Sequence, residues 1–200
     1  MDLAVVLITF GAIFVVELPD KTFVAALVLS TRYPPFMVWL GVGAAFLVQT
    51  IVAVTAGHLV TFLPDNVIKS VAATIFMLGA IVLFRTAPKA DAEEVEQEEE
   101  YAAKAARPRS GFAAASASFV VLFAAEWGDL SQLLTISLVA KYHEAPSVFV
   151  GAWAALLTVS GLAVLVGRFL LRHMRLSTLH YVGAGVCLLL EAITLYEIVK

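Results

Sequence analysis

Two stretches of the chain read FVVELPDKTFVAALVLSTRY, residues 14–33, and FAAEWGDLSQLLTISLVAKY, residues 123–142. They align without gaps, and a phenylalanine, a glutamate, an aspartate, a hydroxyl residue, a basic residue and a tyrosine recur at equal offsets. Apolar helices resemble one another easily because all of them draw on Ala, Val and Leu, but coincident polar positions are uncommon. The sequence therefore predicts two related halves.

The rest of the sequence predicts a membrane protein. Of the 200 residues, 61% are hydrophobic and only 14% are charged, a balance that favours a bilayer as the solvent. Six apolar stretches have the length of a membrane span, at about residues 3–31, 36–62, 67–84, 111–140, 146–171 and 177–199. The first and fourth are longer than one straight crossing and contain acidic residues, so we expect interrupted helices, with Pro19 and Gly128 at the interruptions.

Three spans in each half make the second half enter the membrane from the opposite face. The predicted fold class is an all-α integral membrane protein of six transmembrane helices, arranged as two inverted three-helix repeats. Residues 1–86 are expected to form the first repeat, 87–110 a cytoplasmic acidic linker, and 111–200 the second repeat. Within the linker, the acidic run Asp91 to Glu100 is expected to be solvated and partly disordered, with collection of cations as the alternative role. The N-terminal sequence MDLAVVLITF lacks a basic leader and a cleavage site, so we interpret it as part of the first span.

Basic residues predict the orientation, because cytoplasmic loops of membrane proteins are enriched in Lys and Arg. One side of the membrane receives Arg32, Arg85, Lys89, Lys104, Arg107, Arg109, Arg168, Arg172 and Arg175, and the other side only Lys69, Lys141 and Lys200. The first side is expected to be cytoplasmic, which places both termini outside. The single Cys187 excludes a disulfide framework within the chain, and no basic patch indicates nucleic-acid binding.

Four carboxylates lie within the apolar stretches: Glu17, Asp20, Glu126 and Asp129. An ionised side chain there costs about 2.5 to 3.5 kcal/mol on insertion scales. A spacing of three residues puts the members of each pair on one helix face, and two like charges so close favour a bound cation or a shared proton.

Facing pairs would form an oxygen-rich site for one hard divalent cation, with oxygen atoms of Thr22, Ser131 and Gln132 as further ligands or supporting partners. Such ligands suit Mn²⁺ and Ca²⁺ and accept Mg²⁺, whereas Cu⁺ and Zn²⁺ prefer Cys or His. Because a carboxylate holds either a proton or part of a metal's coordination shell, the site predicts exchange of a cation for protons. The residues do not rank Mn²⁺ against Ca²⁺.

Structural interpretations of the same residues stay open. Intramembrane acids can stabilise helix assembly, and Glu17 with Lys21 could form a neutral pair at i,i+4 spacing. Glu191, in the last span, could relay protons or be satisfied by a neighbour. Gln49 is expected to form an interhelical hydrogen bond, and His58 and His180 to lie near the membrane interface.

The two acidic motifs resemble those of the family of transmembrane protein 165 and yeast Gdt one, also called uncharacterised protein family 0016. That family carries two copies of Glu-x-Gly-Asp-Lys/Arg-Thr/Ser in antiparallel three-helix repeats. The copies here read ELPDKT from Glu17 and EWGDLS from Glu126, so Pro19 replaces the motif glycine and Leu130 replaces the second basic residue. The resemblance covers nearly the whole chain.

The resemblance implies a cation/proton antiporter that moves Mn²⁺ or Ca²⁺ out of the cytoplasm. We expect neither an enzyme nor a cofactor, because the sequence has no His pair with a carboxylate, no Ser/Lys dyad in facing spans and no cofactor loop. It implies Glu17, Asp20, Glu126 and Asp129 as the cation site, beside Thr22 and Ser131, and Lys21 is its one basic motif residue. The short chain is expected in a bacterial plasma membrane, and a homo-oligomer is compatible with the sequence. Competing hypotheses are a membrane scaffold or assembly factor and an exporter of a small organic cation or amino acid.

Overall fold

The computed structural model describes residues 1–18, 20–105, 107, 109–173 and 176–199. These residues form α-helices, one short 3₁₀ turn (Ala87–Lys89) and their connections, with no strand among them. The helices are α1 (Leu3–Glu17), α2 (Lys21–Arg32), α3 (Pro35–Val60), α4 (Asp65–Thr86), α5 (Ala90–Lys104), α6 (Gly111–Ala125), α7 (Leu130–Tyr142), α8 (Ala145–His173) and α9 (Leu176–Val199).

Both stretches that carry the acidic motifs are broken helices. The axes of α1 and α2 differ by 70°, and those of α6 and α7 by 73°. Gly128 lies in the second break with φ +79°, a backbone conformation that glycine adopts without the steric penalty of a side chain. The predicted interruption at Gly128 is therefore confirmed, whereas Pro19 lies outside the described residues.

Four helical stretches of the described chain are long and apolar enough to cross a membrane, namely Pro35–Val60, Asn66–Lys104, Ala145–Val166 and Ser177–Ile198. If each bent pair is one span, the number rises to six. The pattern of large apolar side chains agrees, since many of those on α3, α4 and α9 are exposed on the outer surface of the helix bundle. In water such a surface would be unfavourable, but it suits contact with lipid.

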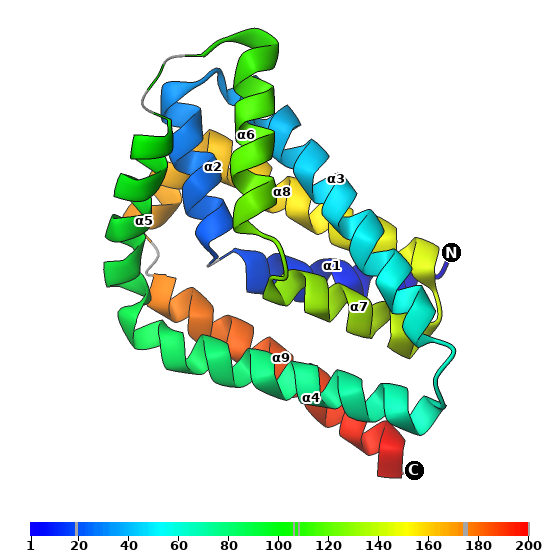
Figure 1. Ribbon diagram of the computed structural model, residues 1–200. Helices are drawn as coiled ribbons and strands as arrows, with labels where there is room; N and C mark the ends of the chain where they lie inside the picture. The colour runs from blue at the N-terminus through cyan, green and yellow to red at the C-terminus, as the bar shows by residue number, and fades with distance from the viewer. Residues whose placement is uncertain (19, 106, 108, 174–175, 200) are drawn as a thin grey trace.

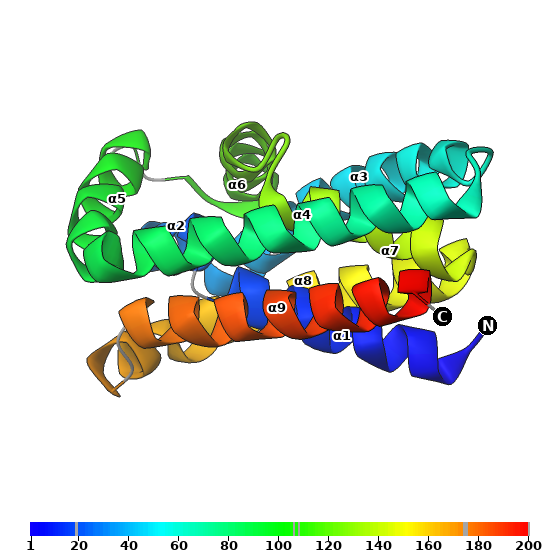
Figure 2. The ribbon, with the colours of Figure 1, turned by 90° about the horizontal axis from the view of Figure 1, so that it is seen from below.

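Helices of the first half pack against helices of the second half, and the contacts of one half have equivalents in the other. The pairs in contact include α1 with α7, α2 with α6, α3 with α8 and α4 with α9. In Figure 1 and Figure 2, α4 and α9 lie side by side and run in opposite directions. Both chain termini lie at the same end of the molecule as the α3–α4 connection, and α5 lies at the other end (Figure 1).

Two glycines let helices of opposite halves approach closely at matching positions. A Cβ atom at Gly41 of α3 would collide with the backbone carbonyl of Ala115 in α6. A Cβ atom at Gly151 of α8 would collide with the backbone carbonyl of Val6 in α1. The offset that aligns the two motifs also aligns Val6 with Ala115, so the two contacts are equivalent in the two halves.

The acidic segment differs from its prediction as a partly disordered linker. Residues Ala90–Lys104 form helix α5, which packs against α2 and α9. Ala90, Tyr101 and Ala105 are buried on one side, while most of its carboxylates are exposed to solvent. Neutral residues recur at helical spacing within the acidic run, and this gives the helix a face that can pack.

The apolar core joins both halves along the middle of the bundle. Its largest fully buried side chains include Ile13, Phe46, Phe76, Leu122 and Leu134, which come from five different helices. Cys187 of α9 is also fully buried in this core. The two halves therefore share one core instead of forming separate domains.

Candidate cation site

The four predicted carboxylates converge on one point between the halves. Each of Glu17, Asp20, Glu126 and Asp129 offers a carboxylate oxygen, and these four oxygens all lie within 4.8 Å of one another. Glu17 ends α1 and Glu126 directly follows α6, while Asp20 and Asp129 precede α2 and α7. The two helix breaks thus place the four side chains together.

The two glutamates are buried without partners. Glu17 is fully buried and Glu126 is 2% exposed, and none of their four carboxylate oxygens has a hydrogen-bond partner. A buried polar group without a partner loses its hydration with no compensation. Glu17 and Lys21 form no ion pair, since no nitrogen of Lys21 lies within 4.0 Å of a Glu17 oxygen among the described contacts. The neutral i,i+4 pair that the sequence left open is absent from this part of the structure.

The two aspartates stand at helix N-termini. Asp20 caps α2, and its Oδ1 accepts a hydrogen bond from the backbone N–H of Lys21 at 2.8 Å. Asp129 occupies the N-cap position of α7 but its side chain makes no capping hydrogen bond. Both are half-buried. The positive ends of two helix dipoles therefore face the four carboxylates and offset part of their mutual repulsion.

The hydroxyl residues of the motifs lie across the interface between the halves. Thr22 and Ser131 are both buried. Thr22 of the first half lies beside the carboxyl group of Glu126, and Ser131 of the second half lies beside that of Glu17. Each motif thus supplies oxygen atoms close to the glutamate of the other motif.

Gln132 holds the second helix break in shape. Its Nε2 donates to the backbone carbonyl of Glu126 at 3.1 Å, and its Oε1 accepts from the backbone N–H of Gly128 at 3.2 Å. Gln49 of α3 donates to the carbonyl of Phe123 at 3.2 Å, which confirms the interhelical hydrogen bond expected of it. These contacts satisfy backbone groups that the break would leave unpaired.

A cavity of about 170 Å³ opens beside the aspartates. Asp20, Lys21, Asp129 and Leu130 are among the residues that line it. Leu130 also packs against α4, since its Cδ1 lies 3.1 Å from the place of a Cβ atom at Gly79, and the Sγ of Cys187 in α9 lies 3.3 Å from the same place. An apolar contact between helices therefore stands where the motif pattern has a second basic residue.

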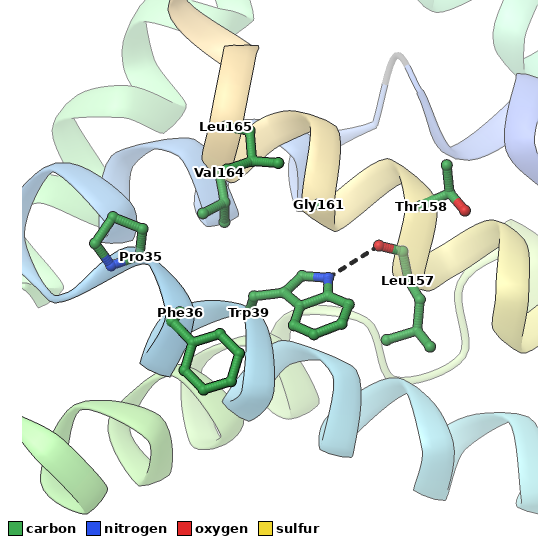
Figure 3. A pocket seen from close by; sticks show the side chains of 8 residues that line it. All are labelled: Pro35, Phe36, Trp39, Leu157, Thr158, Gly161, Val164 and Leu165. Carbon is green, nitrogen blue, oxygen red and sulfur yellow. Dashed lines mark hydrogen bonds between the residues drawn. The ribbon is translucent and has the colours of Figure 1, made fainter.

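Another cavity, of about 610 Å³, lies elsewhere and is lined mainly by apolar side chains (Figure 3). It runs between α3 and α8, where the indole N–H of Trp39 donates to the carbonyl of Leu157 at 3.0 Å. It contains no carboxylate of the motifs, so it has no part in the chemistry of the four acids.

The sequence left a cation-collecting role of the acidic run open, but it did not identify which side chains of α5 reach this region. Glu93 and Gln97 of α5, Thr86 of α4 and His180 of α9 line the 170 Å³ cavity together with Asp20 and Asp129. His180, predicted to be interfacial, therefore faces a polar cavity. The available signal was the spacing of Glu93, Gln97 and Tyr101, which places all three on one side of a helix. Glu191 is half-buried on α9, and no described contact tests its predicted relay role.

Comparison with known proteins identifies the family. The family model described as divalent cation/proton antiporter GDT1 matches residues 5–91 and 114–200. The chain belongs to the GDT1 family. This membership agrees with the resemblance carried by the two motifs, and it describes a transporter and not an enzyme.

Individual GDT1 relatives match over most of the chain. A GDT1-like protein of Synechocystis sp. is 34% identical over 180 residues, covering 86% of this chain and 86% of its own. The chloroplastic GDT1-like protein 1 of Oryza sativa subsp. japonica is 31% identical over 96% of this chain and 61% of its own. Protein PAM71, chloroplastic, of Arabidopsis thaliana is 32% identical over 95% of this chain and 56% of its own. The chain thus spans less than two thirds of both plant relatives, and no solved structure matches it.

Proposed function

We propose that this chain is a secondary transporter that exports a divalent cation, Mn²⁺ or Ca²⁺, from the cytoplasm in exchange for protons. One observation carries the proposal: four carboxylates from two helix breaks meet within 4.8 Å, and the oxygens of the two glutamates are buried without hydrogen-bond partners. Acids that only stabilised helix assembly would be paired. Membership of a divalent cation/proton antiporter family supports the same function.

Glu17, Asp20, Glu126 and Asp129 bind the transported cation in this proposal. The cation replaces the missing partners of the glutamate oxygens, and Thr22, Ser131 and Gln132 add oxygen atoms or hold the ligands in place. When the cation leaves, protons neutralise the carboxylates, because four negative charges so close together, two of them buried, repel one another strongly. The cation and the protons therefore cannot occupy the site at the same time. This mutual exclusion is the requirement for coupled exchange.

The ligand set favours hard cations. The group of described residues that could hold an ion together consists of four carboxylates, whereas Zn²⁺ and Cu⁺ prefer Cys or His ligands. Mn²⁺ and Ca²⁺ both accept carboxylate and hydroxyl oxygens. Lys21 lines the adjoining cavity and limits the net negative charge of the site.

An inverted repeat supplies two similar halves of opposite orientation, so that the site can open to either side of the membrane in a similar way. In this proposal residues 1–86 and 111–200 are the two repeats, the two bent pairs are single spans, and residues 87–110 form the cytoplasmic connection. The antiparallel pairing of α4 with α9 and the equivalent close contacts at Gly41 and Gly151 support this arrangement. The bias of basic residues supports a plasma-membrane topology with both termini outside.

Transport in reconstituted liposomes tests the proposal. With a pH gradient imposed, the purified protein should move Mn²⁺ or Ca²⁺, and Asp20→Asn and Asp129→Asn should abolish the movement. Glu98→Gln is the matched control, because it removes an exposed carboxylate of α5 that does not line the cavity. Unchanged transport in both Asp variants would contradict the site.

The same assay separates the competing functions. A scaffold protein should show no cation flux in liposomes, and loss of its gene should leave cellular metal content normal. An exporter of an organic cation or amino acid should give flux that divalent cations do not inhibit. A deletion strain grown with a panel of divalent cations should accumulate only the ion that the protein exports.

A further inference from the structure

The acidic helix α5 forms one wall of the cavity that adjoins the four carboxylates. Glu93 and Gln97, one helical turn apart on α5, line this cavity with Asp20 and Asp129. A cation that reaches the aspartates from this end of the molecule therefore passes the side chains of α5. The end concerned is the one opposite to both chain termini (Figure 1).

Gln97 has an unused ligand atom in this cavity. Its Oε1 is buried and has no hydrogen-bond partner among the described residues. An amide oxygen is a good ligand for a hard cation, and a carboxylate one turn away is another. A buried acceptor without a partner loses stability unless water or a ligand occupies the space beside it.

The cavity has room for a cation that is still hydrated. Its volume of about 170 Å³ exceeds what one water molecule occupies, about 30 Å³ in the liquid. The charged and titratable groups that line it are Asp20, Lys21, Glu93, Asp129 and His180. Carboxylates outnumber the ammonium group, so the cavity attracts cations.

α5 lies within electrostatic reach of the transport site as well. Burial, followed by the nearby carboxylates of Glu126, Glu100 and Asp20, raises the pKa of Tyr101 above its ordinary value. The helix carries seven acidic residues in the sequence ADAEEVEQEEEYAAK. Glu93 and Glu98 are both exposed to solvent, but only Glu93 lines the cavity.

We propose that Glu93 and Gln97 form an outer binding station for a partly hydrated divalent cation, from which it passes to Asp20 and Asp129. This inference rests on the proposed function, because it concerns how the cation reaches the same site. The acidic run is then not a passive connection between the halves: one of its faces is part of the permeation route.

Transport kinetics of the full chain in liposomes test this station, with Mn²⁺ supplied on the α5 side. Glu93→Gln should raise the Mn²⁺ concentration for half-maximal transport at least threefold and leave the maximal rate nearly unchanged. Glu98→Gln makes the same charge change on the same helix but away from the cavity, so it should leave both quantities unaltered. Equal kinetics of the two variants, with normal transport by the unchanged protein, would overturn the station and leave the proposed function intact.

A binding measurement gives a second readout that does not need transport. By calorimetry with Mn²⁺, Asp20→Asn should retain weaker binding, and adding Glu93→Gln or Gln97→Leu to it should remove at least two thirds of that residual affinity. Equal binding by Asp20→Asn with and without these changes would contradict the proposal. Absence of transport by the unchanged protein would instead contradict the proposed function.

Discussion

Glu17 and Glu126 present carboxylate oxygens within 4.8 Å of each other, although one ends α1 and the other directly follows α6. Neither side chain has a hydrogen-bond partner for its carboxylate oxygens in the described structure. Two helices of opposite halves thus place their acidic ends against each other in the interior. This arrangement is unfavourable by itself and becomes favourable when a cation or protons occupy the space between them.

Glu17→Gln should separate stability from cation binding. Without divalent cation its melting temperature should not fall, because an amide replaces an unpaired buried carboxylate of nearly the same shape. The unchanged protein should gain about 2.7 kcal/mol of stability when Mn²⁺ or Ca²⁺ is present at about 100 times its dissociation constant. Thermal unfolding in detergent, with and without the cation or a chelator, measures both effects.

Glu98→Gln is again the control, since it should keep the full cation-dependent rise in melting temperature. A Glu17→Gln protein that is stabilised by the cation as strongly as the unchanged protein would exclude Glu17 from the site.

Leu130→Lys should weaken cation binding. The side chain lines the cavity with Asp20 and Asp129, and one added positive charge a few ångströms from a divalent cation changes its binding by on the order of 2 kcal/mol. The cation concentration for half-maximal transport should therefore rise roughly thirtyfold. Leu130→Met, which keeps an apolar side chain of similar volume, should transport normally; equal kinetics of Lys and Met variants would show that the charge does not reach the site.

Gly151→Ala and Gly41→Ala should destabilise the bundle. Each added methyl group meets a backbone carbonyl of the other half, and such overpacking typically costs about 1–3 kcal/mol. Gly11→Ala is the control, because nothing lies within 4 Å of the place of its Cβ atom. Melting temperatures in detergent should fall for the first two variants only. Similar values for Gly151→Ala and Gly11→Ala would contradict the close approach of α8 and α1.

Much of the fold and the site could be predicted from the sequence. The polar positions shared by the two stretches identify the four carboxylates, and the apolar stretches match the helices to within a few residues. The structure brings together all four acids, as the aligned motifs led us to expect. Coincident polar residues in apolar helices are informative because burying them is costly.

Other features depend on tertiary contacts that no local pattern reports. The neutral residues within the acidic run give α5 a packing face, yet its position against α2 and α9 follows only from the folded bundle. His180 has the composition of an interfacial residue, and only the arrangement of α9 beside α4 turns it toward the cavity. The sequence shows only that Leu130 replaces a basic residue of the motif. Its packing against Gly79, which lies far from it in sequence, becomes visible only in the folded structure.

Glu197→Gln should destabilise the end of the molecule that carries the termini. Lys141 of α7 has a side chain only 3% exposed, donates to Thr194 Oγ1 at 2.9 Å and pairs with Glu197 at 3.4 Å. Because Glu197 is 39% exposed, solvent screens the pair, and its loss should lower the free energy of unfolding by about 1 kcal/mol.

Lys141→Met should be less harmful than Glu197→Gln, since it removes the buried charge together with its need for a partner. The double variant should then resemble Lys141→Met. A Glu197→Gln variant as stable as the unchanged protein, measured by thermal unfolding in detergent, would show that Thr194 alone satisfies Lys141.

Cys187 is the single cysteine of the chain, and it is buried where α9 meets α4 and Leu130. A water-soluble maleimide therefore finds no accessible thiol on the folded protein. A cysteine introduced at an exposed position of α5, such as Glu98→Cys, becomes the one labelling site without removal of the native residue. Comparing the labelling of intact cells with that of inverted vesicles shows on which side of the membrane the acidic helix lies.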